Sequence, residues 1–164
     1  RALHASGLTG AELGRRFGVS DTQARNVAIG RQWAPDDLPV WPLPSAWLGV
    51  SAENPATADE RIPVLLATPA AVRFVSCEPL LGQVGLARHF PRAHGMRNDR
   101  FWVIAGGESG PGARPCDAEW LRSLVRQCAD AEVPCFVKQL GGHPNKRADI
   151  TEWPADLRVQ EWPR

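Results

Sequence analysis

The sequence predicts an α/β fold, with a parallel sheet that closes partly as a barrel or stays open, preceded by a small all-α helix-turn-helix-like module. The sheet is predicted because four short apolar runs alternate with helical or crossover segments, and polar residues follow each run. The clearest unit begins at Phe101–Ala105, where an apolar run ends in a glycine-rich loop and an amphipathic helix follows from Asp117. Two short helical patterns separated by a tight turn near the N-terminus predict the module.

Composition limits the class of protein. With 164 residues, 43% hydrophobic and 23% charged, the chain resembles an ordinary globular domain with a small appendage. No apolar run is long enough to span a bilayer and no signal-peptide pattern is present, so we expect a cytoplasmic protein without a membrane partner. The four cysteines form no CxxC pair, which favours reduced, mostly buried thiols over a zinc ribbon. Because the chain begins with Arg1 rather than Met, we expect a fragment or a processed piece.

Residues 1–33 form the predicted helix-turn-helix-like module. Thr9 with Glu12, and Ser20 with Gln23, are capping-box pairs that should begin two short helices. This segment carries a net charge of +3 and the rest of the chain −2, so only the segment favours a polyanion. The residues expected to contact DNA are Thr22, Gln23, Arg25, Asn26 and Arg31. The alternative is that these side chains are only the solvated face of a helical hairpin.

Residues 34–46 contain four prolines and are predicted to be an extended linker, which leaves residues 47–164 as the sheet domain. Thr57 and Glu60 form a capping box that should begin the first helix of this domain. Asp117 is expected to cap the helix after the third strand rather than to act as a catalyst. The four expected strands are Trp47–Ser51, Val72–Cys77, Phe101–Ala105 and Pro134–Lys138.

Two segments do not fit the strand–helix alternation. Leu80–Arg100 is too long for an ordinary connection and carries a cluster of arginines, so we expect a lid or a substrate-facing insertion. Asp149–Arg164 carries two Trp-Pro pairs and should be an irregular segment whose tryptophans pack on the sheet. Three histidines without metal-ligand spacing are interpreted as surface residues: His89, His94 and His143.

Polar residues follow all four strands, and parallel strands bring their carboxyl ends to one rim. Carboxylates and an ammonium group meeting there would shift one another's pKa, act as acid or base, or hold a divalent ion. We assign no metal ligand and no catalytic residue. Alternatively, Glu78 and Glu108 cap helices or pair with basic residues, for which the candidates are Arg73, Arg114 and Lys138. The residues predicted to line the rim are Glu53, Asn54, Glu78, Gly106, Gly107, Glu108, Ser109, Arg114, Lys138 and Gln139.

Three long stretches, WLGVSAENPATADERIPVLLATPAAVRFVSCEPLLGQVGL, FWVIAGGESGPGARPCDAEWLRSLVRQCADAEVPCFVKQLGG and EWPADLRVQEWP, closely resemble a phage protein family of unknown function. The family is named after gene products thirty-seven and sixty-eight of mycobacteriophages, and the resemblance covers Trp41–Arg164. It implies a radical-SAM-like protein with a partial parallel (β/α) barrel. It also implies an amino-terminal three-cysteine motif for an iron–sulfur cluster, and an association with a three-Cys-motif partner protein.

The resemblance also implies S-adenosylmethionine as a cofactor and radical chemistry on a substrate, with nucleic acid as one candidate. Gly106-Gly107-Glu108 resembles the GGE triplet that binds the cofactor's amino group in such enzymes. This chain contains no CxxxCxxC motif, so it resembles the carboxyl-terminal half only. We therefore expect this chain alone to bind no cofactor and to need a cluster-bearing partner half.

Three functions follow as hypotheses. The first is the carboxyl half of a radical-SAM-like barrel that keeps a ligand rim at its strand ends. The second is a DNA-binding protein with a non-catalytic α/β body. The third is metal-dependent hydrolysis at the carboxylate rim. The first two are compatible, and whether the chain is an enzyme stays open.

Overall fold

A computed structural model gives the fold of the chain. It describes residues 9, 11–12, 15, 20, 42–94, 97–142 and 149–163. The chain divides into two units, Arg1–Trp41 and Pro42–Arg164, and the division falls inside the predicted linker. In the first unit the capping box is confirmed, because the Glu12 N–H donates to Thr9 Oγ1 (3.3 Å) and the Thr9 N–H donates to Glu12 Oε2 (2.6 Å). The five predicted DNA contacts lie outside the described residues, so the helix-turn-helix stays a prediction.

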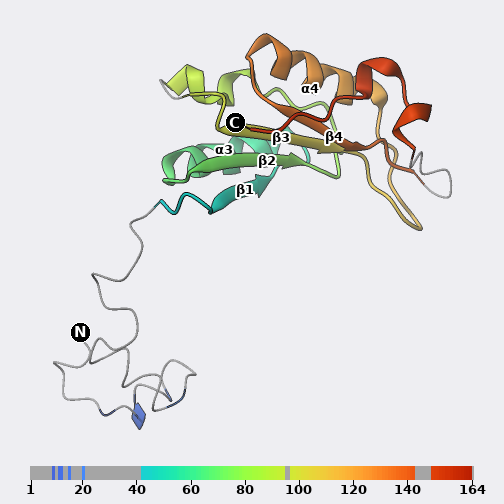
Figure 1. Cartoon of the computed structure of the whole chain (residues 1–164). Helices are drawn as coiled ribbons and strands as arrows, with labels where there is room; N and C mark the ends of the chain where they lie inside the picture. Colours follow the sequence, from blue (N-terminus) through green and yellow to red (C-terminus); the bar gives the residue numbers. More distant parts are fainter. Residues whose placement is uncertain are drawn as a thin grey trace. The chain divides into compact units, whose positions relative to one another are not determined.

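The second unit contains a four-stranded parallel sheet in the order β1-β2-β3-β4 (Figure 1). Helix α3 (Pro55–Ala67) connects β1 to β2, and helix α4 (Ala118–Asp130) connects β3 to β4. The α/β class and the parallel sheet are therefore confirmed, while partial closure as a barrel stays a prediction. The strands are β1 (Trp47–Ser51), β2 (Val72–Cys77), β3 (Phe101–Gly106) and β4 (Cys135–Gln139). Short 3-10 turns are Ala87–His89, Pro91–His94, Ile150–Glu152 and Ala155–Leu157.

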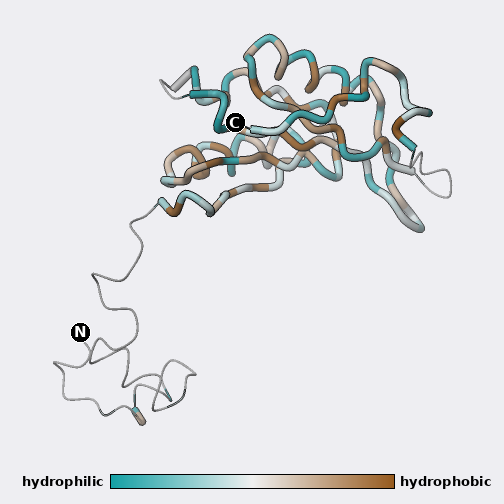
Figure 2. The backbone as a smooth tube through the Cα atoms, in the orientation of Figure 1, coloured by the Kyte–Doolittle hydropathy of each residue, from teal (hydrophilic) through white to brown (hydrophobic). Residues whose placement is uncertain are grey.

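One face of the sheet carries the hydrophobic core. In the strand register Val75 lies between Val50 and Val103, and Cys135 follows on β4, so these side chains share a face. The buried residues of both helices belong to the same core cluster. They are Ala58, Ile62, Leu65 and Leu66 on α3, and Leu121, Leu124 and Cys128 on α4. Figure 2 shows hydrophobic positions recurring along the strands and helices of this unit.

The expected lid between β2 and β3 is wrong, because the apolar residues of this segment are part of the core. A substrate-facing role for the arginines of the segment stays a prediction. The side-chain amide of Gln127 on α4 fastens the segment: its Oε1 accepts the Leu86 N–H (2.6 Å) and its Nε2 donates to the Val84 carbonyl (3.1 Å). The segment therefore fills the helix-side layer between α3 and α4. Its buried apolar residues are Leu80, Val84, Leu86 and Phe90.

The opposite face of the sheet, here called the helix-free face, carries an aromatic cluster. Trp102 lies at its centre, with its ring stacked on Trp162 of the C-terminal tail at a centroid distance of 4.7 Å. Three more rings meet Trp102 edge-on at 5.9–6.4 Å: Trp47, Phe74 and Phe136. The tail runs antiparallel beside β4 (Figure 1), where the Val137 N–H donates to the Val159 carbonyl (2.8 Å). The expected packing of the tail on the sheet is confirmed for Trp162 by its contacts with Trp102 and Phe136, and Trp153 is buried.

Two local predictions were wrong. Helix α3 begins at Pro55 rather than after Thr57, because Asn54 is its N-cap: Asn54 Oδ1 accepts the Thr57 N–H (3.1 Å), and Thr57 Oγ1 accepts the Asn54 N–H (3.2 Å). His89 is not a surface residue, because it is buried and its Nε2 lies 3.0 Å from a carboxylate oxygen of Asp59. Asp117 caps α4 as predicted, accepting the Glu119 N–H at 2.9 Å.

Candidate functional site

The carboxyl edge of the sheet holds the predicted rim, and its centre is an ion pair between two strand ends. Lys138 Nζ on β4 lies 3.1 Å from Glu78 Oε2, just beyond β2. Between them runs the end of β3, where Gly106 has no side chain. A Cβ added at Gly106 would lie 3.4 Å from the Glu78 carboxyl carbon, so the carboxylate rests over this glycine.

Strand alternation places this pair on the helix-free face. Ser76 and Phe136 point away from the core face in the strand register, and Glu78 and Lys138 each lie two residues further along. The Glu78 side chain is 15% exposed and that of Lys138 is 57% exposed. Glu78 is thus mostly buried and its partner Lys138 is exposed. The pair is reachable from solvent through the Lys138 ammonium group.

Glu53 is engaged by the helix that follows its own strand. Arg61 Nη1 on α3 lies 3.3 Å from Glu53 Oε2 and also donates to the Ser51 carbonyl at 2.9 Å. Asn54, another predicted rim residue, is the N-cap of the same helix. Both side chains thus have a local structural role at the end of β1.

Glu108 is held within the loop after β3. Its carboxylate accepts two hydrogen bonds from the Arg114 guanidinium, from Nε at 2.7 Å and from Nη2 at 3.0 Å, and a third from the Arg114 N–H at 2.9 Å. The side-chain hydrogen bonds from Arg114, followed by its backbone N–H, lower the pKa of Glu108 to about 2. Glu108 is therefore ionised at neutral pH and is unsuited to act as a general base there.

The loops after β3 and β4 are fastened to each other. Gln139 is buried, and its Nε2 donates to the Gly107 carbonyl at 2.7 Å. The Gly107 N–H donates to the Gln139 carbonyl (3.1 Å), and the Gly142 N–H to the Glu108 carbonyl (2.8 Å). Ser109 forms a parallel bridge with Gly142. Close packing of these two loops, rather than a ligand, accounts for the position of Gln139.

The structure thus brings together Glu78, Gly106 and Lys138. The other rim candidates have partners in helix α3 or in the loops after β3 and β4. The alternative pairing of Glu78 with Lys138 and of Glu108 with Arg114 is confirmed. A single cavity shared by Glu53, Glu78, Glu108 and Lys138 stays a prediction. Within the described ranges no group of three or more His, Cys, Asp or Glu could hold a metal ion. The helices in this part of the chain also include none long and apolar enough to cross a membrane.

The positions of Gly107 and Glu108 in the GGE-like triplet are explained without bound S-adenosylmethionine. Glu108 already accepts three hydrogen bonds from Arg114. A Cβ at Gly107 would lie 2.5 Å from the Leu140 carbonyl oxygen and 2.8 Å from Cys116 Cβ. Packing therefore explains the second glycine and pairing explains the glutamate, so we derive no step through this cofactor.

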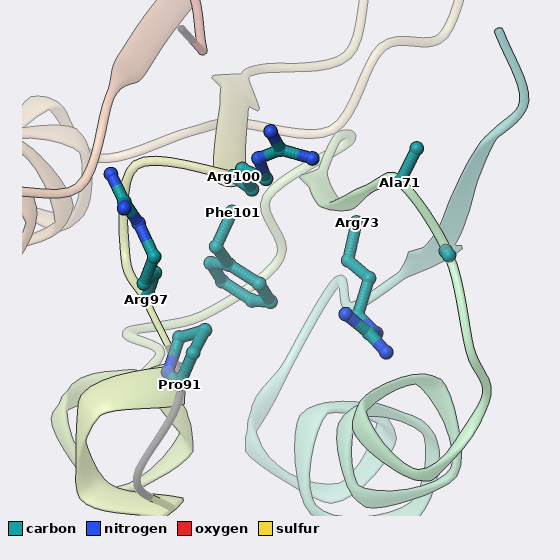
Figure 3. Close-up of a pocket in the computed structure, with 7 residues that line it drawn as sticks. Ala71, Arg73, Pro91, Arg97, Arg100 and Phe101 are labelled. Carbon is teal, nitrogen blue, oxygen red and sulfur yellow. The ribbon is translucent and has the colours of Figure 1, made fainter. Parts of the chain in front are cut away.

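Sequence reasoning missed a cavity at the amino edge of the sheet, of about 300 Å³ (Figure 3). The arginine cluster before β3 was visible in the sequence, but its approach to Arg73 on β2 was not, because it depends on the register between the two strands. The lining residues are Ala70, Ala71, Arg73, Pro91, Arg97, Arg100 and Phe101.

Comparison with known families places the chain. The family model described as Protein of unknown function (DUF5131) matches residues 13–161. The chain belongs to this family. The DUF5131 match begins inside the predicted helix-turn-helix-like module and ends in the tail beside β4. No curated protein and no solved structure matches the chain.

Proposed function

We propose that this DUF5131 chain binds a small polar ligand at the carboxyl edge of its sheet, as the ligand-binding half of a barrel-like protein. The observation that carries the proposal is the Glu78–Lys138 pair over Gly106 on the helix-free face. Parallel α/β folds bind their ligands at this edge. A carboxylate and an ammonium group side by side can receive a ligand that carries both a donor and an acceptor group, such as an amino acid moiety.

The exposure of Lys138 supports this role. A bound ligand that offers a cation to Glu78 and an anion to Lys138 replaces one ion pair with two, and both interactions strengthen when water is excluded. Glu108 accepts three hydrogen bonds from Arg114, so it does not exchange its partner for a ligand in this way. Binding is thus assigned to the centre of the rim, not to the whole set of strand-end residues.

Catalysis is assigned to a partner. The resemblance to radical-SAM-like phage proteins, together with the absence of a CxxxCxxC motif from this sequence, supports a chain that presents the ligand while a cluster-bearing half or three-Cys-motif protein reacts with it. On this proposal the chain alone cleaves no S-adenosylmethionine. Cleavage by the purified chain would contradict this division of labour.

The experiment maps backbone amide shifts of the 15N-labelled chain with methionine as the probe. We expect shifts at the ends of β2, β3 and β4, and loss of those shifts in Glu78→Gln and Lys138→Gln. Glu132→Gln is the matched control, because Glu132 is 81% exposed and pairs only with the exposed Arg92 within the described residues. Shifts confined to other parts of the chain, or unchanged binding in both rim variants, would refute the proposal.

DNA binding by residues 1–33 is the second candidate, favoured by the capping box between Thr9 and Glu12. We expect the full chain to bind duplex DNA with an affinity that falls steeply as salt increases. Arg25→Ala and Asn26→Ala should weaken this binding. Equal binding by both variants and the parent chain at low salt would exclude this role for the module.

A further inference from the structure

The amino edge of the sheet carries a basic cavity, at the end opposite the proposed ligand rim. Arg73 is the second residue of β2 and pairs in register with Phe101, the first residue of β3. The Arg73 N–H donates to the Arg100 carbonyl at 3.0 Å, which fixes the distance between the two backbones. Figure 3 shows Arg73, Arg97 and Arg100 around Phe101 and Pro91. The cavity therefore has the buried Phe101 ring in its wall and three arginines among its lining residues.

Arg73 is held in place from one side only. Its Nε donates to the carbonyls of Leu65 (3.1 Å) and Thr68 (3.0 Å), at the C-terminal end of α3. These bonds use the inner nitrogen and satisfy helix-end carbonyls. The two outer nitrogens of Arg73 have no hydrogen bond to any described residue, so an anchored guanidinium keeps its terminal donors unused.

Arg100 differs from the other arginines of the segment before β3. Arg88 pairs with Asp59, Arg92 with Glu132, and Arg97 with Asp99. The side chain of Arg100 has no hydrogen bond and no ion pair within the described part of the chain. The charged residues that line the cavity are all arginines, and the Asp99 carboxylate, which pairs with Arg97, is not among the lining residues.

We propose that this cavity binds a phosphate group, carried by a small molecule or by a nucleic-acid backbone. Arginine suits this ligand because its planar group donates two parallel hydrogen bonds to phosphate oxygens. Arg97 is oriented by Asp99, with its Nε 3.0 Å from Oδ1, so two of the three arginines are already positioned before a ligand arrives. A merely solvated basic patch would not require an anchored Arg73 beside an unpaired Arg100. The site is independent of the ligand rim.

The test measures pyrophosphate binding to the full chain by isothermal titration calorimetry at low ionic strength. Arg100→Gln should weaken binding about ten-fold or more, as expected for loss of a charge-assisted hydrogen bond. Arg126→Gln is the matched control, because Arg126 is 63% exposed and its ion pair with Glu119 is long, at 4.0 Å. The affinity of this variant for pyrophosphate should change less than two-fold. Unchanged thermal unfolding will show that both variants are folded.

Two further arms identify the source of the phosphate. A phosphomonoester, ribose 5-phosphate, and a twelve-nucleotide single strand are titrated separately, and each must lose affinity in Arg100→Gln. Tighter binding of the strand assigns a nucleic-acid backbone, and tighter binding of the monoester assigns a small molecule. Equal affinity of Arg100→Gln and the parent chain for pyrophosphate, or equal losses in Arg100→Gln and Arg126→Gln, would overturn the proposal.

Discussion

Gly107→Ala should destabilise the sheet domain strongly, because the loops after β3 and β4 leave no room for a Cβ. The added carbon would lie 2.5 Å from the Leu140 carbonyl oxygen, 2.8 Å from Cys116 Cβ and 2.9 Å from Gly141 Cα. Two of these atoms are backbone, so no rotamer change relieves the contacts. Overpacking costs about 1–3 kcal/mol, and with backbone on two sides we expect about 2–3 kcal/mol. For a domain of this size, that lowers Tm by roughly 6–12 °C.

Thermal and urea unfolding, followed by circular dichroism, measure this effect. Gly85→Ala is the matched control, because no heavy atom lies within 4 Å of its added Cβ; its stability should change by less than about 0.5 kcal/mol. If Gly107 instead serves a ligand that approaches the backbone closely, Gly107→Ala will unfold like Gly85→Ala and lose only binding. Equal Tm values for the two variants would therefore refute the packing explanation.

Three other predictions concern pairing and burial. In the native chain at pH 8, at most one thiol, that of Cys116, should react with Ellman's reagent. Its reaction should be slow, because burial raises the pKa of the Cys116 thiol to about 11. Fast reaction of more than one thiol would contradict the buried core. Arg114→Gln should return the Glu108 pKa from about 2 toward 4.5, measured by carboxyl NMR titration. A carboxyl group whose pKa is lower in the folded than in the unfolded chain stabilises the fold at pH values above its unfolded pKa. The urea midpoint of Arg114→Gln should therefore lie below that of the parent chain by the full amount near pH 7, and this difference should shrink as the pH falls from about 4.5 to 2. Trp162→Ala should change the near-ultraviolet circular dichroism and cost about 1 kcal/mol through loss of the stack on Trp102; an unchanged spectrum would argue against the stack. The thiols expected to stay unreactive until unfolding are Cys77, Cys128 and Cys135.

The strands were predictable because their signal is local. The first two predicted strands have the bounds that the structure gives, Trp47–Ser51 and Val72–Cys77. The third differs by one residue at its carboxyl end and the fourth by one residue at each end. Each is a run of apolar, β-branched or aromatic residues bounded by polar, proline or glycine residues. The start of α3 was ambiguous because two capping patterns overlap. Asn54 is the N-cap because Pro55 suits the first helical position, and Thr57 is the third helical residue, which completes the capping box.

The connection before β3 was not predictable, because its apolar residues follow neither a helical nor a strand period. Leu80, Val84 and Leu86 are fully buried, and the backbones of Val84 and Leu86 are held by a polar residue, Gln127, more than forty positions away. The tail next to β4 posed the same difficulty, since its pairing depends on a strand edge that only the folded sheet creates. The ion pairs at the rim could be predicted as alternatives, but choosing among partners required the register.

The helix-free face changes character along its strands, and this change argues for a site better than any single residue does. Around Trp102 it is aromatic. The next row in register is polar on β1 and β2, with Ser51 and Ser76, and apolar on β3 and β4, with Ile104 and Phe136; the Glu78–Lys138 pair lies beyond this row. All-parallel sheets usually have both faces covered, so burial alone would favour apolar residues to the end of each strand. The Glu78–Lys138 pair instead lies at the edge where such sheets hold their ligands. The proposed ligand site accounts for a charged pair at this position, which packing alone would not favour.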